Sequence, residues 1–144
     1  MVIDSFSRDF GFLSNFFNSP MRIKGKIWPT VEHLFQACKT KDESVREKIR
    51  LCSTAGRAKR MGRKIKLRDD WEEIKEEVML WCLRLKFRDP QLAKKLLETG
   101  DNILIEGNNW HDNFWGLCFC DKCKPHGGKN MLGKLLMKVR KEIG

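Results

Sequence analysis

Three polar side chains recur along one expected helix at a spacing that could serve acid–base chemistry. The stretch WPTVEHLFQACK, residues 28–39, begins with Trp-Pro, which favours extended backbone, and Thr30 is a good N-cap. At 3.6 residues per turn, Glu32, Gln36 and Lys39 fall on one face, opposite the apolar positions. This row could line a polar site. Such a row is typical of the solvated face of an amphipathic helix, and the spacing alone favours that interpretation.

A second polar cluster occupies NNWHDNFWG, residues 108–116. Tryptophan is costly in a loop unless it packs or stacks on a flat partner. Asp112 among indole rings would be partly desolvated, which suits a carboxylate that does acid–base work. The alternative is a loop whose Trp110 and Trp115 fill the core while Asp112 caps a turn.

Positive charge is densest in AGRAKRMGRK, residues 55–64, where Arg57 and Arg63 are interleaved with Gly56 and Gly62. Arginine forks match phosphate oxygens, and glycines let a phosphate approach the backbone. A solvated basic helix is the alternative. The net charge of +10 predicts a phosphate-bearing partner, such as a nucleotide, a nucleic acid or a phosphorylated sugar. The sequence contains no P-loop, Rossmann glycine pattern, nucleophile elbow or HExxH motif.

A short segment, CFCDKCKPH, contains the candidate ligands of a structural zinc site: Cys118, Cys120, Cys123 and His126. The C-x-x-C spacing of Cys120 and Cys123 is typical of zinc sites, and four N/S ligands would close the coordination shell. A complete site usually takes a second, distant ligand pair, and CFC alternates as a half-buried strand would. Packing cysteines are therefore the alternative. The lone histidines His33 and His111 are assigned no ligand role.

The composition predicts one soluble domain over residues 1–144. The chain is 41% hydrophobic and 33% charged, and no apolar run is long enough to span a bilayer. The N-terminal MVIDSFSRDF lacks the regions of a signal peptide, which predicts a cytoplasmic protein with no membrane partner. Its six cysteines are then expected to be thiols or metal ligands rather than disulfides.

Capping residues and hydrophobic periodicity predict a mainly α fold with a few short β-strands. We expect helices that start at Thr30, Asp42, Ser53 or Thr54, Asp70, Asp89 and Asn130. The helix from Asp70 carries a predicted capping box with Glu73, and the last helix runs to about residue 142. Short strands are expected within residues 1–6, 22–28, 102–107 and 114–120, and a packed loop within residues 10–20.

These motifs, taken in order, resemble the NADAR superfamily of YbiA-like domains, named for a proposed link to NAD and ADP-ribose. The matching stretches are FGFLSNFF, WPTVEHLFQACK, AGRAKRMGR, LRLKF, LLETGDNILIEGN, DNFWG and GKNMLGKLLMKVR, which together cover nearly the whole chain. The resemblance implies a compact, mostly helical YbiA-like fold. Known members are N-glycosidases: some cleave phosphorylated intermediates of riboflavin biosynthesis, and others remove ADP-ribose from modified guanine. The Cys-rich CFCDKC departs from many members and resembles phage-like ones.

The resemblance implies which residues serve catalysis. Glu32 and Asp112 would divide two tasks: one stabilises an oxocarbenium-like cation or activates water, and the other binds ribose hydroxyls or assists the leaving base. Lys39, the lysine of the family's EHxFQAxK motif, would contact a phosphate or a ribose oxygen, or add to the opened sugar aldehyde. The expected substrate-binding residues are Asn15, Gln36, Arg57, Arg63, Trp71, Trp115 and Arg140. No metal or redox cofactor is required for this chemistry.

Two other function classes would use the same residues. A non-catalytic module that binds ADP-ribose or another NAD metabolite needs the aromatics and arginines but not two carboxylates. A basic nucleic-acid-binding domain with a structural zinc knuckle predicts salt-dependent binding to plain DNA or RNA. The expected partners of the enzyme are phosphate-bearing nucleotides or ribosyl substrates, with ADP-ribosylated nucleic acid among them.

Overall fold

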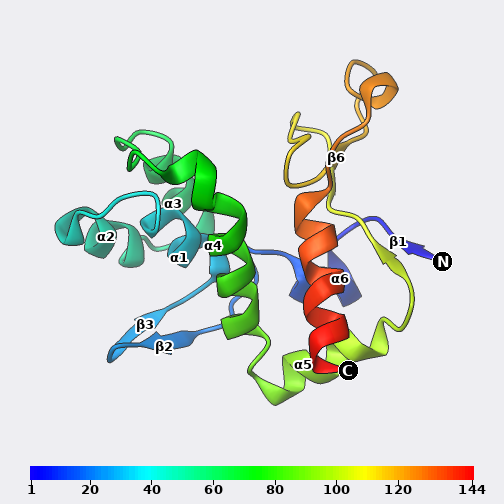
Figure 1. The fold of residues 1–144 in the computed structure, drawn as a ribbon, viewed down its shortest axis with the longest axis horizontal. Helices are drawn as coiled ribbons and strands as arrows, with labels where there is room; N and C mark the ends of the chain where they lie inside the picture. The colour runs from blue at the N-terminus through cyan, green and yellow to red at the C-terminus, as the bar shows by residue number, and fades with distance from the viewer. The chain divides into compact units, whose positions relative to one another are not determined.

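The computed structural model describes every residue, Met1–Gly144, and the chain divides into two compact units. Unit 1 comprises Met1–Ser14 and Phe87–Gly144, and unit 2 comprises Asn15–Lys86. Helices predominate in the ribbon, and the strands are short pairs (Figure 1). The predicted class, mainly α with a few short strands, is confirmed, whereas the single domain stays a prediction. No helix combines the length and apolarity needed to cross a membrane.

Unit 2 consists of a β-hairpin followed by four helices. Strands β2 (Met21–Ile23) and β3 (Lys26–Trp28) pair antiparallel. The two turn residues, Lys24 and Gly25, have φ of 50° and 81°, the backbone hand that matches the twist of a two-residue hairpin. The helices are α1 (Val31–Ala37), α2 (Glu43–Arg50), α3 (Ala55–Gly62) and α4 (Trp71–Lys86).

The predicted N-caps start three of these helices. The side chain of Thr30 accepts a hydrogen bond from the His33 N–H, and Asp42 and Thr54 cap α2 and α3 in the same way. The capping box predicted at Asp70 is wrong. The Asp70 carboxylate instead accepts two bonds from the Arg68 guanidinium, at 2.6 and 3.2 Å. Such charge-assisted bonds are stronger than a bond to a backbone amide, so Arg68 takes the carboxylate.

Helix α1 is the centre of unit 2. It contacts α2, α3 and α4, and every residue from Val31 to Ala37 is buried. A seven-residue helix covered in this way has no solvated face, so the interpretation of the Glu32 row as an exposed surface is wrong. In contrast, Trp81 of α4, which follows the apolar spacing of that helix, is 43% exposed.

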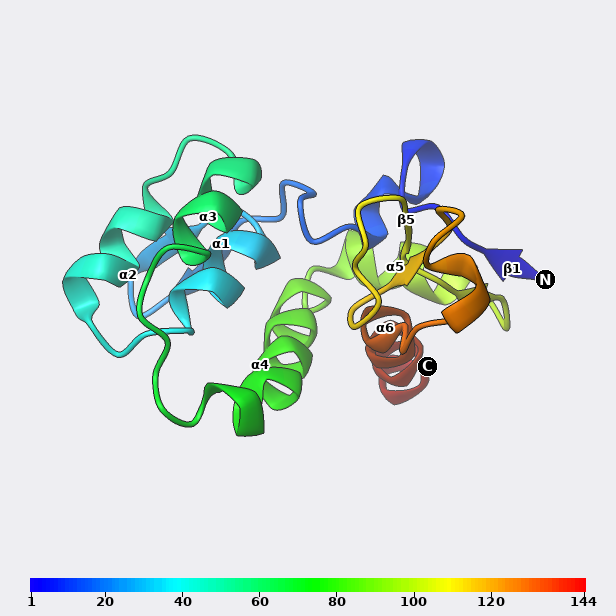
Figure 2. The same ribbon diagram turned by 90° about the horizontal axis from the view of Figure 1, so that it is seen from above.

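Unit 1 combines two parallel strand pairs with two helices. Strand β1 (Val2–Ile3) pairs with β4 (Ile103–Leu104), and β5 (Gly107–Asn108) pairs with β6 (Leu117–Cys118). Helices α5 (Pro90–Glu98) and α6 (Met131–Ile143) contact each other, and α6 also contacts β4 (Figure 2). Two short 3₁₀ helices complete the unit, η1 (Arg8–Leu13) and η2 (Lys124–His126). The first of these replaces part of the loop expected within residues 10–20, and β5 was not expected.

One buried lysine makes unit 2 sensitive to pH. Lys86, the last residue of α4, is 1% exposed, and its Nζ lies 5.7 Å from the centre of the Phe17 ring. Burial lowers the pKa of the Lys86 amine to about 7, because a low-dielectric surrounding disfavours the ammonium form. The unfolded chain therefore holds one more proton than the folded chain between pH of about 7 and the ordinary lysine pKa of about 10.4, and stability rises with pH in this window.

We predict that Lys86→Met flattens this rise and stabilises the protein at pH 6 by roughly 2 kcal/mol or more, because the buried ammonium is removed. Urea unfolding from pH 6 to pH 10 measures both effects. Lys94→Met, at an exposed position of α5, is the control and should keep the wild-type slope. An unchanged slope in Lys86→Met would contradict the assignment.

Candidate functional site

The carboxylate of Glu32 is buried in the first turn of α1. Its side chain is 6% exposed, and its Oε1 accepts a hydrogen bond of 3.2 Å from Nε2 of Gln36, one turn later. The backbone N–H of Glu32 donates to the carbonyl of Asn15 at 3.1 Å. The first bond ties the carboxylate to the middle of α1. The second ties the backbone at the start of α1 to the segment that precedes β2.

Helix α3 fixes the Gln36 side chain by close approach. A Cβ atom on Gly62 would lie 1.9 Å from Oε1 of Gln36 and 2.7 Å from its Cδ, so only glycine fits there. Because a carboxylate only accepts hydrogen bonds, the amide must turn its Nε2 toward Glu32 and its Oε1 toward α3. Of the two glycines in AGRAKRMGR, Gly62 is therefore required for packing against Gln36. The phosphate approach that the sequence suggested for this segment stays a prediction.

Two amide oxygens beside Glu32 are buried without a hydrogen-bond partner in the protein, Oε1 of Gln36 and Oδ1 of Asn15. The Asn15 amide nitrogen makes only a weak contact of 3.6 Å with the sulfur of Met79. Buried polar atoms in native proteins are almost always bonded, so each of these acceptors calls for an explanation. Oε1 of Gln36 faces Gly62 of α3, where there is no room for a further group. A ligand hydroxyl, which is a donor, would satisfy Oδ1 of Asn15.

Lys39 lies half-buried just past the end of α1, with its Nζ 6.0 Å from the centre of the Phe35 ring. Burial is the main cause that lowers the pKa of the Lys39 amine, and the charges of Arg63 and Lys59 lower it further. The negative charge of Glu32 acts in the opposite direction and raises the Lys39 pKa. The predicted row of Glu32, Gln36 and Lys39 is thus one connected group, with cations of α3 close to its lysine end.

Trp71, at the start of α4, packs on Phe35, one of the apolar residues of α1. Its ring centre lies 5.1 Å from that of Phe35, at an angle of 57°, and the side chain is 4% exposed. Of the two arginines expected to bind phosphate, Arg57 is exposed on α3 and donates to Oγ of Ser53 at 2.9 Å, and Arg63 is exposed directly after α3. The roles expected for these three side chains in substrate binding stay predictions.

The Asp112 loop of unit 1 is organised by Asn108. The buried Asn108 accepts hydrogen bonds from the backbone N–H groups of Trp110 and Asp112 and donates to the Asp112 carbonyl at 2.9 Å. Oδ1 of Asp112 accepts from the N–H groups of Phe114 and Trp115, at 3.1 and 2.9 Å. Asp112 therefore caps a turn, as the structural alternative stated, and its Oδ2 lies outside this cap. That alternative is wrong for Trp110, which is 59% exposed instead of filling the core.

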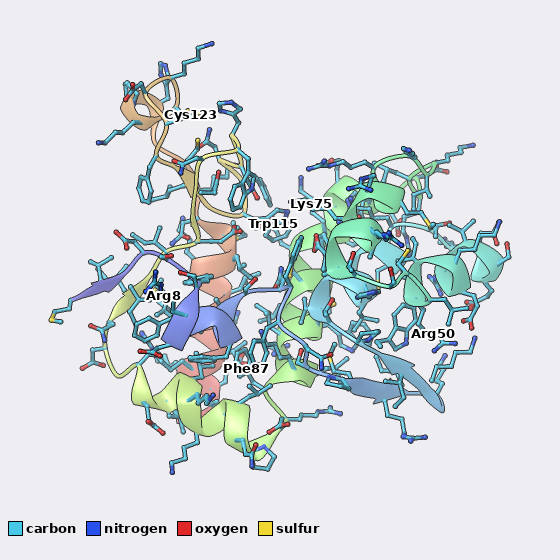
Figure 3. The ribbon with its side chains drawn as sticks, turned by 180° about the vertical axis from the view of Figure 1, so that it is seen from behind. Arg8, Arg50, Lys75, Phe87, Trp115 and Cys123 are labelled. Carbon is cyan, nitrogen blue, oxygen red and sulfur yellow. The ribbon has the colours of Figure 1, made fainter.

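Trp115 and Arg140 both belong to the part of unit 1 around α6. Trp115, labelled in Figure 3, belongs to the loop between β5 and β6. Its ring packs edge-on against Phe114, with ring centres 4.7 Å apart, and its carbonyl accepts from the Leu132 N–H of α6. The Arg140 guanidinium donates to Oγ1 of Thr99 and to the carbonyl of Asn102, both at 2.9 Å. These bonds give Arg140 a structural task, and its expected phosphate contact stays a prediction.

The cysteine cluster differs from the one expected. The sulfur atoms of Cys118, Cys120 and Cys123 gather around His111, and all four potential ligand atoms lie within 4.8 Å of one another. His126 is not part of this group, so the expected fourth position is corrected to His111. The prediction took the fourth ligand, His126, from the residues after the C-x-x-C pair. In the structure, the histidine beside the cysteines is His111, which precedes them in the loop between β5 and β6. His33 is a core residue, with its ring nitrogens bonded to Thr30 and to the Cys52 carbonyl.

Comparison of the chain with known proteins identifies its family. Residues 4–144 match the family model described as the NADAR domain. The chain is 44% identical over 143 residues to N-glycosidase YbiA of Escherichia coli (strain K12), an alignment that covers 96% of this chain and 85% of that protein. It is 38% identical to an N-glycosidase of Nostoc punctiforme, with 93% of this chain and 86% of that protein covered.

Two further similarities concern a longer protein and a solved structure. A riboflavin biosynthesis protein of Vibrio vulnificus is 40% identical over 136 residues, which cover 92% of this chain and 35% of that protein. The NMR structure of the E. coli protein YbiA superposes with a TM-score of 0.82 at 41% identity, and the match covers 99% of this chain and 84% of that chain.

We predict that Gly62→Ala lowers turnover of an N-glycoside substrate at least tenfold while the protein stays folded. The new methyl group must displace the Gln36 amide, and with it the hydrogen bond to Glu32. Steady-state kinetics and circular dichroism measure activity and folding.

Gly56→Ala is the matched control on the same helix, because the nearest atom to its new Cβ is Oγ1 of Thr54 at 3.9 Å. Alanine is also the better helix former, by roughly 0.5–1 kcal/mol, so this control should be at least as stable as the wild type and fully active. Equal activity of the two alanine variants would show that the Gln36 position does not matter.

Proposed function

Because the chain belongs to the NADAR domain family, we propose that it is an N-glycosidase that hydrolyses the bond between C1 of a ribose and a base nitrogen in a phosphate-bearing substrate. The names of its relatives from E. coli and N. punctiforme support this class of reaction. The observation that carries the proposal is the buried Glu32 carboxylate, which Gln36 bonds, together with the unpartnered side-chain oxygen of Asn15, the residue whose backbone carbonyl accepts the Glu32 N–H.

The chemistry follows from a buried negative charge. When the C1–N bond breaks, its electron pair leaves with the base nitrogen, which takes up a proton, and the ribose becomes an oxocarbenium-like cation. Water then adds to C1 and releases a proton. A carboxylate such as Glu32, removed from bulk water, stabilises the developing cation more strongly than an exposed one could, and it can accept the proton of the attacking water.

The neighbours of Glu32 fit a ribose with a phosphate. Oδ1 of Asn15 is an unpartnered acceptor, and a ribose hydroxyl is a donor that could bond it. Lys39, with Arg63 and Arg57 on α3, supplies positive charge for the phosphate. Trp71, in the same unit, is assigned to a ring system of the substrate. Asp112 and Trp115 belong to unit 1, and the roles that the family resemblance implies for them, a second carboxylate and a stacking ring, stay predictions.

Two substrate groups carry the required ribose: ADP-ribosyl-guanine on a nucleotide or nucleic acid, and the ribosylaminopyrimidine phosphates of riboflavin biosynthesis. The second group is supported by the name of the V. vulnificus relative. Incubation of the protein with both substrates, NAD and free ADP-ribose, followed by mass spectrometry, identifies the bond that breaks. Binding of ADP-ribose without cleavage of any compound would favour a binding module, and salt-dependent binding to plain DNA alone would favour a nucleic-acid-binding domain.

We predict that Glu32→Gln loses about 100-fold or more in turnover of the cleaved compound, because the substitution removes the charge and keeps the shape. Glu77→Gln, at an exposed position of α4, is the control and should retain wild-type turnover. Thermal unfolding of both variants verifies folding. Full activity of Glu32→Gln would exclude the proposed role.

Lys39→Ala distinguishes the two tasks proposed for the lysine. If the amine only holds phosphate, the variant has a raised KM, and a high substrate concentration restores turnover. If the amine adds covalently to the sugar aldehyde, turnover is lost at every concentration, and borohydride traps an adduct only in the wild type. Wild-type kcat and KM in Lys39→Ala would contradict both tasks.

A further inference from the structure

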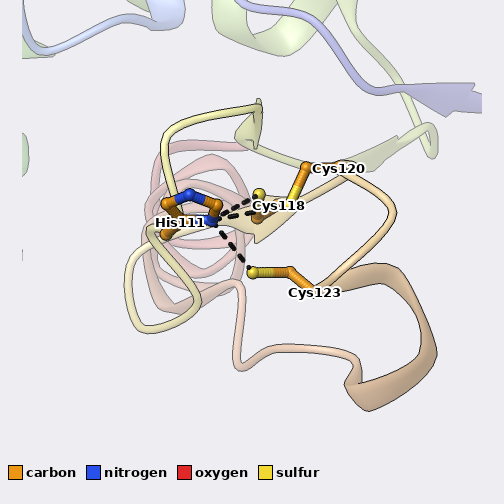
Figure 4. Close-up of side chains that lie close together, drawn as sticks. All are labelled: His111, Cys118, Cys120 and Cys123. Carbon is orange, nitrogen blue, oxygen red and sulfur yellow. Dashed lines mark hydrogen bonds between the residues drawn. The ribbon is translucent and has the colours of Figure 1, made fainter.

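The side chains of His111, Cys118, Cys120 and Cys123 converge on one point at the end of unit 1 that carries β6 (Figure 4). Nδ1 of His111 lies 3.3 Å from the sulfur of Cys123, 3.4 Å from that of Cys120 and 3.9 Å from that of Cys118. None of these four residues takes part in the proposed hydrolysis. We propose that they form a structural zinc site with three thiolate ligands and one imidazole ligand.

The distances match the edges of a zinc tetrahedron. Zn–S bonds of about 2.3 Å and Zn–N bonds of about 2.0–2.1 Å at tetrahedral angles place sulfur and nitrogen roughly 3.5–3.6 Å apart. The three observed nitrogen–sulfur distances, 3.3, 3.4 and 3.9 Å, lie on both sides of that value. The nitrogen–sulfur distances therefore fit a coordination shell before any ion is added, and all four ligand atoms lie within 4.8 Å of one another.

Hydrogen bonds to His111 alone do not explain why three sulfur atoms lie around its Nδ1. An imidazole Nδ1 offers either one lone pair or one N–H group, so it cannot satisfy three sulfur atoms at once. Four ligand atoms around one shared cation satisfy all of them together. Thiolate and imidazole ligands favour zinc over hard cations such as magnesium or calcium, and four protein ligands leave no open position for catalysis.

The backbone around the cluster holds the ligands in place. The Asn108 side chain accepts the N–H groups on both sides of His111, and His111 itself has a φ of 69°, which is uncommon for a residue with a side chain. Oδ1 of Asn113 accepts the N–H of Cys118 at 3.1 Å, and the Cys120 carbonyl accepts the N–H of Cys123 at 3.2 Å. The site thus draws on the loop after β5, on β6 itself and on the turn after β6.

The zinc would close the loop that carries Asp112 and Trp115. His111 precedes that turn and Cys118 follows it, so one ion bonded to both ends limits how far the turn can open. At the other side, the carbonyls of Asn113, Phe114 and Trp115 accept N–H groups from residues 129–132, at 2.8 to 3.0 Å. The zinc proposal does not rest on the proposed hydrolytic activity, because it gives the metal a structural role only.

The test is the metal content of the full chain purified with a reductant and without a chelator. We expect about one zinc per chain by elemental analysis, and X-ray absorption that fits three sulfurs at about 2.3 Å and one nitrogen at about 2.0–2.1 Å. Less than a tenth of an equivalent, both as purified and after incubation with zinc sulfate and desalting, would overturn the proposal. A shell with oxygen ligands or fewer than three sulfurs would overturn it as well.

Variants distinguish the two histidines. His111→Ala should weaken zinc binding at least tenfold in a chelator competition, and the double variant Cys120→Ser with Cys123→Ser should lose the metal. His126→Ala is the matched control, an exposed histidine in the same segment, and should keep one equivalent with wild-type affinity. Loss of zinc in His126→Ala with retention in His111→Ala would overturn the ligand set. The absorption measurement on the wild type decides the matter if a variant fails to fold.

Discussion

The burial of one carboxylate, Glu32 of α1, constrains the structure of unit 2. A buried charge is tolerated only when neighbouring groups bond it, so the helix must supply Gln36 one turn away and α3 must come close enough to hold that amide. Gly62 is the consequence on α3, since any side chain there would occupy the space of the amide. Burying polar groups costs folding free energy, and in unit 2 several of the buried polar groups lie around Glu32. Such an arrangement is expected where a protein uses a charge for chemistry.

In unit 1, side-chain hydrogen bonds support the irregular loop between β5 and β6. Its strand pairs are only two residues long, so they contribute few backbone hydrogen bonds. Asparagine and aspartate side chains replace the missing strand partners: Asn108 and Asp112 bond the N–H groups of the loop, and Asn130 bridges the Glu106 N–H and the Leu104 carbonyl. The proposed zinc would hold the two ends of this loop together through His111 and Cys118.

Local signals in the sequence predicted the helix boundaries well. Thr30, Asp42, Thr54 and Asp89 each cap the helix that follows, because an N-cap bond involves residues two or three positions apart and depends little on the rest of the fold. The same reasoning failed at Asp70, where Arg68, two residues before it, offered a stronger partner. The periodicity of α1 could not show that its polar face is buried, since burial depends on α2, α3 and α4.

Candidate residues were harder to predict where the fold joins distant segments. The family resemblance supplied Glu32, and the structure added the contacts that single it out, the Gln36 bond and the unpartnered side-chain oxygen of Asn15. His111 was set aside as a lone histidine because its partners follow seven or more residues later, across β6. A ligand set of this kind can be identified only when the structure shows which distant residues a loop brings together.

The most direct test of the central claim is a crystal structure of the protein with ribose 5-phosphate, the moiety that the proposed substrates share. Glu32 should face C1 of the ribose, with a sugar hydroxyl bonded to Oδ1 of Asn15 and the phosphate near Lys39. A ribose 5-phosphate bound elsewhere, with Glu32 and Oδ1 of Asn15 unchanged and out of its reach, would contradict the account.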